Sequence, residues 1–234
     1  MAELQALAIA GMPLGERTGN DRSIAHFAAA NGHAAALKAL ADVGTPLGEH
    51  DAEGLTPAHW AALNGHAAAL KALARAGAPL GNRDAEGRTP AHRAAFNGHT
   101  AALEGRGRAG TPLGRRDADG RMPAHGVAFN GHTAVLAARV GEPLGDRDGN
   151  GRTPAHWAAG YGHVAALEAL SRRGLSLGER DEDSRTPVHF AAIKGHPDAL
   201  AALARAGVPL GDRDAHGRTP AHWAAGYGHV AALE

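Results

Sequence analysis

Small apolar residues occur in two short stretches of helical spacing, most clearly between residues 56 and 77. Residues 56–64 read as a helix with Thr at the N-cap and Pro at the first helical position, followed by Gly. Residues 66–75 read as a second helix, with Leu70 and Leu73 on one face and another Gly after its end. Residues 78–88 are rich in Gly, Pro and Asp and predict a loop centred on an Asp-x-x-Gly turn. The pattern therefore predicts helix, turn, helix and a projecting finger.

This pattern returns along the whole chain. The heptapeptide TPAHWAA at Thr56 has counterparts spaced by 33 residues, except for one interval of 31. The counterparts begin at Ser23, Thr89, Met122, Thr153, Thr186 and Thr219. A fixed period of this length is typical of repeat proteins, in which each unit contacts only its neighbours.

The predicted fold class is an all-α repeat solenoid, a stack of helix-turn-helix units with projecting finger loops. Neither helix is long enough to be stable alone, so stacking must supply the common core. We expect a single array over residues 4–234. Its parts are a partial unit at 4–22, units starting at 23, 56, 89, 122, 153 and 186, and a partial last unit at 219–234.

Composition narrows the class of function. The 234 residues carry 24 Lys and Arg against 24 Asp and Glu, and this zero net charge argues against binding nucleic acid or an anionic membrane. The absence of Cys excludes disulfides and thiolate chemistry. No signal peptide or membrane segment is evident. We expect a monomer that is cytoplasmic, or delivered into a host cell if it is an effector.

The repeated unit resembles the ankyrin repeat, through the motif D-x-x-G-x-T-P-x-H-x-A-A-x-x-G-H and a second helix with spaced leucines. The resemblance implies a curved stack of helix pairs with β-hairpin fingers and a role in binding other proteins. The chain departs from the family where Ala follows TP, as at Ala58, in place of the usual Leu. It also departs where Gly replaces a common finger Asn, as at Gly81.

Histidine is the residue type that most invites a catalytic or metal-binding interpretation. Seven of the 16 His stand in the TPxH position and seven more follow a Gly seven residues later. Helices of neighbouring units lie about 8–10 Å apart, too far for these columns to share one zinc ion. We therefore expect the TPxH histidines to form hydrogen bonds within and between units, and we predict no catalytic, cofactor-binding or metal-binding residue.

Charged residues also follow the period. An Asp opens each finger turn, and Arg usually stands before it and again before TP, as in Arg83, Asp84 and Arg88. One interpretation is that Asp accepts hydrogen bonds from the turn and pairs with Arg. The other is that the fingers form an arginine-bearing rim that meets acidic partners.

The aromatic residues all lie on the first helices. The column directly after the TPxH histidine, which includes Trp60 and Trp157, is expected to pack partly between units. In the ankyrin family, the residues just before Gly-His and the finger tips line the concave face, where aromatic anchors favour protein binding. The predicted partner-binding residues are Leu55, Asn64, Arg88, Phe96, Asn97, Arg121, Phe129, Asn130, Arg152, Tyr161, Arg185, Ile193, Lys194, Arg218 and Tyr227.

Two functions follow from these residues. The first is a non-catalytic scaffold that binds a protein partner through this face. The alternative is a regulatory or targeting segment of a larger protein, such as a secreted bacterial effector, whose activity lies outside these residues.

The units are unequal in the middle of the chain. Gly105 and Gly107 stand at helical Ala positions, Arg106 replaces a core Leu, and Met122 replaces the capping Thr. Each change is expected to cost stability, so a soft segment is predicted at 103–142. The alternatives are a binding kink or sequence drift.

Both ends lack polar capping units, which normally keep such arrays soluble. Residues 151–168 and 217–234 are identical, which indicates internal duplication. We therefore expect the sequence to be a cut array or a fragment.

Overall fold

The computed structural model describes residues 14–104, 114–138 and 144–233. The chain divides into two compact units, Met1–Ala118 and Asp119–Glu234. From here on, 'unit' means one of these two parts, and a single 33-residue element is called a repeat. Each unit is built from the helix pairs that the repeat predicts.

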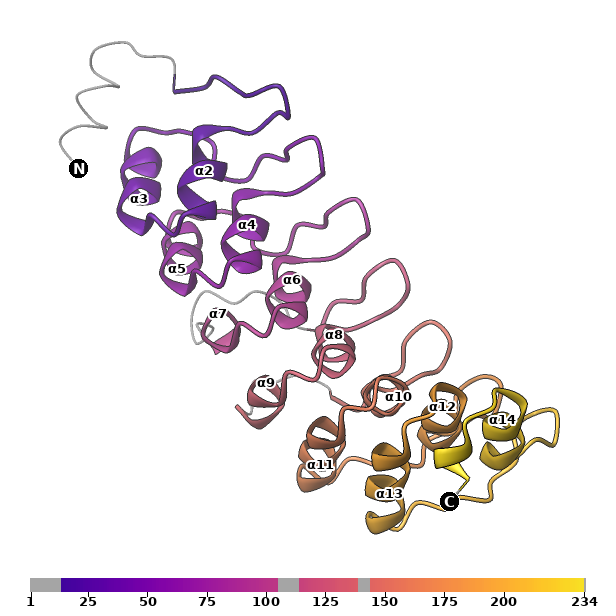
Figure 1. The fold of residues 1–234 in the computed structure, drawn as a ribbon. Coiled ribbons are helices and arrows are strands. Elements are labelled where there is room, and N and C mark those ends of the chain that lie inside the picture. Colours follow the sequence, from indigo (N-terminus) through magenta and orange to yellow (C-terminus); the bar gives the residue numbers. More distant parts are fainter. Residues whose placement is uncertain (1–13, 105–113, 139–143, 234) are drawn as a thin grey trace. The chain divides into compact units, whose positions relative to one another are not determined.

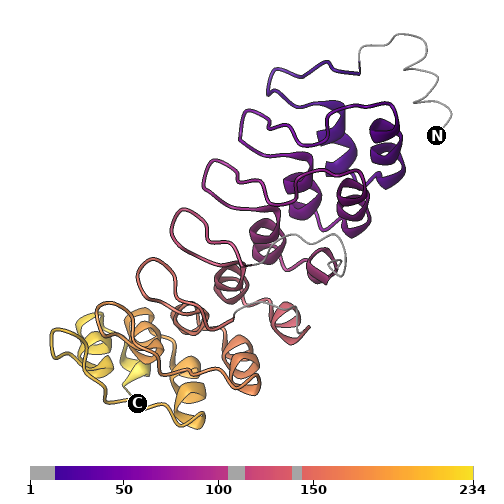
Figure 2. The same cartoon turned by 180° about the vertical axis from the view of Figure 1, so that it is seen from behind.

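In the first unit, α2, α4 and α6 lie side by side in one row, with α3 and α5 adjacent in a second (Figures 1 and 2). The loops between successive pairs project from the first row (Figure 1). The helices of this unit are α2 (Ile24–Ala30), α3 (Ala34–Asp42), α4 (Pro57–Leu63), α5 (Ala67–Arg75), α6 (Pro90–Phe96) and α7 (Thr100–Glu104).

The second unit repeats this arrangement, with α8, α10, α12 and α14 in the first row and α9, α11 and α13 in the second. Its helices are α8 (Pro123–Phe129), α9 (Thr133–Ala137), α10 (Pro154–Gly160), α11 (Val164–Arg172), α12 (Pro187–Lys194), α13 (Pro197–Arg205) and α14 (Pro220–Gly226), followed by a 3-10 turn η1 (Val230–Ala232). The predicted all-α repeat solenoid is confirmed.

The start of each first helix follows from its TP dipeptide. In α4 the side chain of Thr56 accepts a hydrogen bond from the backbone N–H of His59, and Pro57 occupies the first turn. Pro costs nothing there because its missing N–H would have no intrahelical acceptor. Leu70 and Leu73 are buried on one face of the second helix, as predicted. Small residues of α4 such as Ala61 and Ala62 are fully buried.

The fingers are loops, and the described residues contain no strand beyond an isolated bridge between Arg17 and Ser23. Backbone hydrogen bonds close the finger loops, for example from Asp148 N–H to Arg152 O at 2.8 Å and from Asp214 N–H to Arg218 O at 2.9 Å. A second one links neighbouring fingers, as from Glu182 N–H to Asn150 O at 3.1 Å. The hairpin shape expected of the fingers therefore comes from turns.

The predicted soft segment is only partly visible. Gly105, Arg106 and Gly107 lie outside the described residues, as do 139–142, and the proposal of reduced stability stays a prediction. Met122 is buried, and its backbone N–H still donates to His125 Nδ1 at 3.0 Å although it lacks the capping hydroxyl. The partial unit at 4–22 is described only from residue 14 onward, so the boundaries of a single array also stay a prediction.

The glycine of the Gly162-His163 pair is fixed by two independent constraints. Gly162 has φ +71°, in the left-handed region that disfavours side chains. The imidazole of His196 from the next repeat also lies against it, so that a Cβ on Gly162 would come within 2.8 Å of His196 Nδ1. By contrast, Gly174 has φ +74° with nothing within 4 Å of such a Cβ.

We predict that Gly162→Ala destabilises the protein by more than Gly174→Ala. Both variants carry the strain of a left-handed alanine, about 1–2 kcal/mol. Only Gly162→Ala also displaces the neighbouring imidazole, at a typical cost of about 1–3 kcal/mol for overpacking. Urea unfolding of the two variants measures the difference, and equal loss of unfolding free energy would contradict the packing role of His196.

Candidate protein-interaction surface

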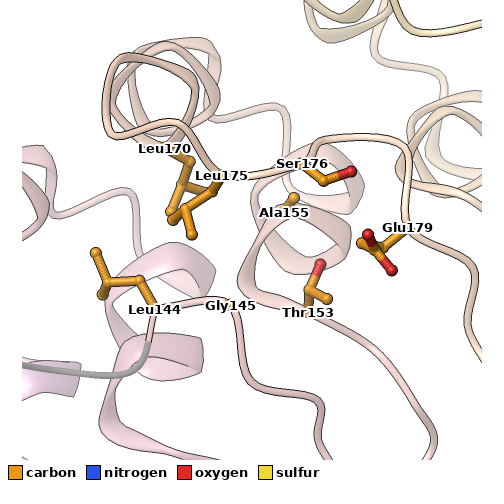
Figure 3. Close-up of a pocket in the computed structure, with 8 residues that line it drawn as sticks. All are labelled: Leu144, Gly145, Thr153, Ala155, Leu170, Leu175, Ser176 and Glu179. Atoms are coloured by element: carbon orange, nitrogen blue, oxygen red, sulfur yellow. The ribbon is translucent and has the colours of Figure 1, made fainter.

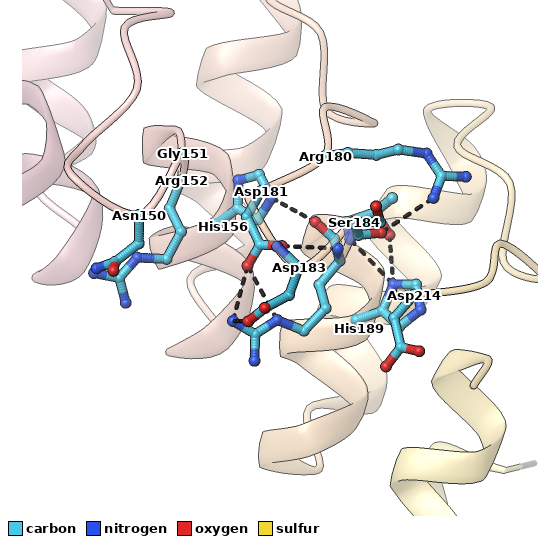
Figure 4. A network of polar contacts seen from close by, with 12 residues as sticks. Asn150, Gly151, Arg152, His156, Arg180, Asp181, Asp183, Ser184, His189 and Asp214 are labelled. Atoms are coloured by element: carbon cyan, nitrogen blue, oxygen red, sulfur yellow. Dashed lines mark hydrogen bonds and ion pairs between the residues drawn. The ribbon is translucent and has the colours of Figure 1, made fainter. Parts of the chain in front are cut away.

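The TPxH histidine holds each finger to the helix of the preceding repeat. His156 Nδ1 accepts a hydrogen bond from Thr153 N–H at 3.0 Å, and Thr153 Oγ1 lies at the same distance. His156 Nε2 lies 3.0 Å from the backbone oxygen of Arg185, in the next repeat. Both ring nitrogens are thus occupied, which confirms the structural role predicted for this column. Figure 4 shows His156 and His189 beside the finger residues Asp181 and Asp214 of the second unit.

The hydrogen-bond pattern requires neutral imidazoles. The Thr N–H is a donor, so Nδ1 must be unprotonated, and the carbonyl oxygen requires a proton on Nε2. Burial lowers the pKa of His59 and of His156 to about 4, against the opposing effect of hydrogen bonds to carbonyl oxygens. Burial likewise lowers the pKa of His26 and His189. These histidine side chains have a structural role, and they are poorly suited to exchange protons near neutral pH.

The finger Asp is the second fixed polar group. Asp148 Oδ1 accepts from the backbone N–H groups of Asn150 and Arg152, both at 3.0 Å. Its Oδ2 accepts from Arg152 Nε at 2.9 Å and from Trp157 Nε1 at 3.1 Å. Burial disfavours the charged carboxylate, but these hydrogen bonds and the Arg152 charge outweigh it and lower the pKa of Asp148.

The arginines directly before the TP dipeptide form ion pairs with these Asp carboxylates. Arg152, Arg185 and Arg218 each pair with the finger Asp four residues earlier, at 2.9–3.0 Å. The guanidinium of Arg218 also lies 4.0 Å from the ring centroid of Trp223. Arg88 Nε lies 3.5 Å from Asp84 Oδ2, and Arg121 pairs with Asp119. The Asp–Arg pairing is confirmed, and an arginine rim free to meet acidic partners receives no support from these contacts.

Sequence reasoning missed the role of the aromatic column after the TPxH histidine. Trp60, Trp157 and Trp223 each donate from Nε1 to the finger Asp of their own repeat, at 2.9–3.1 Å. Arg93 occupies the same position and donates to Asp84 Oδ2 at 2.9 Å. A constant spacing of nine residues between Asp and this donor was the available signal.

The predicted partner-binding residues of the first unit do not all reach the surface. Leu55 is buried, so its side chain offers no contact. Phe96, at the end of α6, is 48% exposed. Asn64 and Asn97 are exposed, and each uses its Nδ2 on a backbone carbonyl, of Ala30 and of Arg93 respectively.

In the second unit, the corresponding positions bring aromatic rings together. The rings of Phe129 and Tyr161, from α8 and the end of α10, have centroids 4.3 Å apart. Tyr161 is 45% exposed and Tyr227, after α14, is 56% exposed. Lys194 is exposed at the end of α12, while Asn130 and Ile193 are half-buried. We call Asn64, Phe96, Asn97, Phe129, Asn130, Tyr161, Ile193, Lys194 and Tyr227 the helix-end row.

A small pocket of about 110 Å³ lies elsewhere in the second unit, lined by residues of α10, of α11 and of the loops beside them (Figure 3). Its lining includes Leu144, Thr153, Ser176 and Glu179. Ser176 stands where the other fingers carry Pro, and the corresponding Pro79 packs closely against Gly48. The pocket therefore reflects a missing proline ring and suggests no ligand.

These features define a helical repeat protein in which His, Asp, Trp and Arg columns hold neighbouring repeats together while other residues at the helix ends stay accessible. A family model described as ankyrin repeats (3 copies) matches residues 13–105 and 173–234, and one described as ankyrin repeat matches residues 150–182. The chain belongs to the ankyrin repeat family. Proteins of this family are generally protein–protein interaction modules and typically non-catalytic scaffolds.

Solved structures agree with this assignment. The human ASB11 ankyrin repeat domain is 27% identical, with a TM-score of 0.75, and the match covers 91% of this chain and 97% of that one. The ankyrin repeat domain of Bcl-3, described as a unique member of the IkappaB protein family, has the same fold at 22% identity. Its TM-score is 0.73, and the match covers 86% of this chain and 93% of that one.

No match was found among curated proteins. Within the described ranges, no helix combines the length and apolar character needed to cross a bilayer.

We predict that stability falls as the pH drops from about 6.5 to 4. In this window the unfolded chain protonates His59 and His156 while the folded chain keeps them neutral, so acid favours unfolding. Each lowered pKa contributes at most roughly 3 kcal/mol. The finger aspartates, whose folded pKa values are lowered, lose their contribution mainly below about pH 4. Urea unfolding at several pH values measures the slope.

The control is His156→Gln, which retains an N–H donor but cannot titrate. This variant should be less stable at pH 7 and should lose less stability on acidification. An equal loss in both proteins would contradict the role of the neutral imidazole.

Proposed function

We propose that the chain is a non-catalytic scaffold that binds a protein partner through its helix-end row. The observation that carries this proposal is the exposure of Phe96, Tyr161 and Tyr227 at the ends of α6, α10 and α14. Exposed aromatic residues on a rigid element are typical anchors of protein interfaces, because they supply large contact area at low entropic cost.

The surroundings of these rings support the same conclusion. Phe129 packs against Tyr161, and Trp157 stacks on it with centroids 6.3 Å apart, so the tyrosine has restricted freedom before any partner arrives. Preorganisation of this kind reduces the entropy lost on binding. Asn97 uses only its Nδ2 within the described residues, so its amide oxygen can accept a hydrogen bond from a partner.

The ion pairs of the finger arginines limit which kinds of partner surface can bind. Because Arg152, Arg185 and Arg218 already pair with aspartates, a strongly acidic partner gains little from them. We propose instead a partner surface with an apolar centre that covers the rings and polar groups at its rim.

We predict that Tyr161→Ala combined with Phe96→Ala lowers the recovery of specific partners about tenfold or more. Loss of an aromatic anchor typically costs about 2 kcal/mol or more of binding free energy. The measurement is quantitative mass spectrometry after affinity capture with each variant as bait. The matched control is Arg172→Ala, since the side chain of Arg172 on the second helix is 70% exposed.

Recovery equal to that of the unchanged chain, from a variant with the same circular dichroism and unfolding midpoint, would reject the helix-end row. A partner lost with Arg172→Ala alone would place the binding face on the second helices.

A further inference from the structure

The residue directly before each Gly-His pair differs between the two units. In the first unit this residue is Asn, and Asn31 and Asn97 each donate from Nδ2 to the backbone oxygen four residues earlier, at 2.9 and 2.8 Å. In the second unit the same column continues with Asn130, Tyr161, Lys194 and Tyr227. The side chains of Tyr161 and Lys194 form no hydrogen bond with a described residue. The polar groups of these two side chains are therefore available to a partner.

Lys194 is the isolated charge of this face. No other Lys, Arg, Asp or Glu occurs in the first helices of the second unit, α8, α10, α12 and α14. The finger arginines beside these helices pair with carboxylates, as Arg185 does with Asp181 at 3.0 Å. Lys194, by contrast, is exposed and forms no ion pair with any residue in the described ranges. Its ammonium group is a positive charge that only solvent compensates.

This charge lies beside the exposed ring of Tyr161. The two residues stand at the ends of α10 and α12, which pack directly on each other. Neighbouring packed helices lie about 8–10 Å apart. A typical protein interface buries about 800 Å² on each partner, a patch that is much wider than this separation. A partner that covers the ring of Tyr161 therefore also covers Lys194.

Covering Lys194 limits the chemistry of the partner. An ammonium group that loses its water without gaining an acceptor costs free energy, so a wholly apolar partner surface is penalised at this position. A partner that supplies an anionic acceptor regains this free energy through a charge-assisted hydrogen bond. Lys194 thus selects against apolar surfaces that the aromatic rings alone would accept.

A carboxylate fits this position better than a phosphate. Phosphate groups are typically recognised by clusters of arginine, and the arginines before TP in the second unit already pair with Asp. One lysine balances the single negative charge of an Asp or Glu side chain. The hydroxyl of Tyr161 is a further donor beside it.

We propose that the protein partner presents an Asp or Glu carboxylate to Lys194, within an apolar surface that covers the ring of Tyr161. This inference rests on the proposed function, because it assigns the chemistry of the partner at the helix-end row. The Lys194 ammonium donates to the carboxylate. Phe129 and Trp157, which pack against Tyr161, hold its ring under the apolar part of the partner.

The test is selection of binders from a library of short random peptides displayed on phage. The baits are the immobilised whole chain and two variants, Lys194→Met and Lys194→Glu. Lys194→Met keeps a long side chain and removes the charge, whereas Lys194→Glu reverses the charge. The matched control is Lys71→Glu, which makes the same reversal at an exposed position of the second helix α5.

The unchanged chain and Lys71→Glu should enrich peptides that combine Asp or Glu with aromatic or aliphatic residues. Lys194→Met should enrich apolar peptides without a preference for acidic residues, and Lys194→Glu should enrich peptides with Lys or Arg. For a synthetic peptide from the first selection, fluorescence polarisation should show a Kd about tenfold higher with Lys194→Met, as for loss of a close interfacial charge pair. Replacing the acidic residue of this peptide by Lys should restore binding to Lys194→Glu.

The outcomes separate this inference from the proposed function. Peptides that lose binding with Tyr161→Ala but bind the unchanged chain and Lys194→Glu equally well would overturn the inference and leave the proposed function standing. If no peptide is enriched, or if the enriched peptides bind Tyr161→Ala as well as the unchanged chain, both are rejected. Circular dichroism and the unfolding midpoint of each variant establish that it is folded.

Discussion

The buried, neutral imidazole of the TPxH histidine is the interaction on which the rest of the structure depends. It joins three parts that belong to different segments: the helix that carries it, the Thr that caps this helix, and the finger of the next repeat. His59 does this with bonds of 3.1 Å to Thr56 N–H and 3.0 Å to the Arg88 oxygen. Without the ring, a buried backbone donor and a buried acceptor would both lose their partners, at about 1–3 kcal/mol each. The burial that makes the bonds strong also forbids the charged ring.

The TPxH histidine forms a hydrogen bond to the next repeat. The burial of a residue therefore depends on the neighbouring repeat as well as on the local sequence. The two identical 18-residue segments demonstrate this: His156 is buried, whereas His222 is exposed. The free energy of unfolding of such an array is a sum of contributions from each repeat and from each interface between neighbouring repeats. A repeat face that contacts no neighbour adds no interface contribution.

The sequence predicted the repeat, the helix pairs and the structural use of His because these depend on local spacing. TP, Gly-His and the spaced leucines act within one repeat or between adjacent ones. What escaped prediction depends on how loops fold back in three dimensions. The bond from Trp157 to Asp148 crosses a finger, and Leu55, expected at an exposed finger tip, is buried. The second His column was visible as a pattern, but its packing on the preceding Gly requires two stacked repeats.

The same geometry separates positions that can vary from positions that cannot. His, Thr and Asp columns are tied to bonds that every repeat needs, and they change little along the chain. The position four residues after the TPxH histidine carries no such bond from its side chain, and it changes from Ala30 to Leu63, Phe96, Phe129, Gly160, Ile193 and Gly226. A large residue there extends the helix-end row, whereas Gly admits a Phe from the next repeat. One variable column therefore determines both where an aromatic ring stands at the end of a first helix and which side chain of the next repeat can pack there.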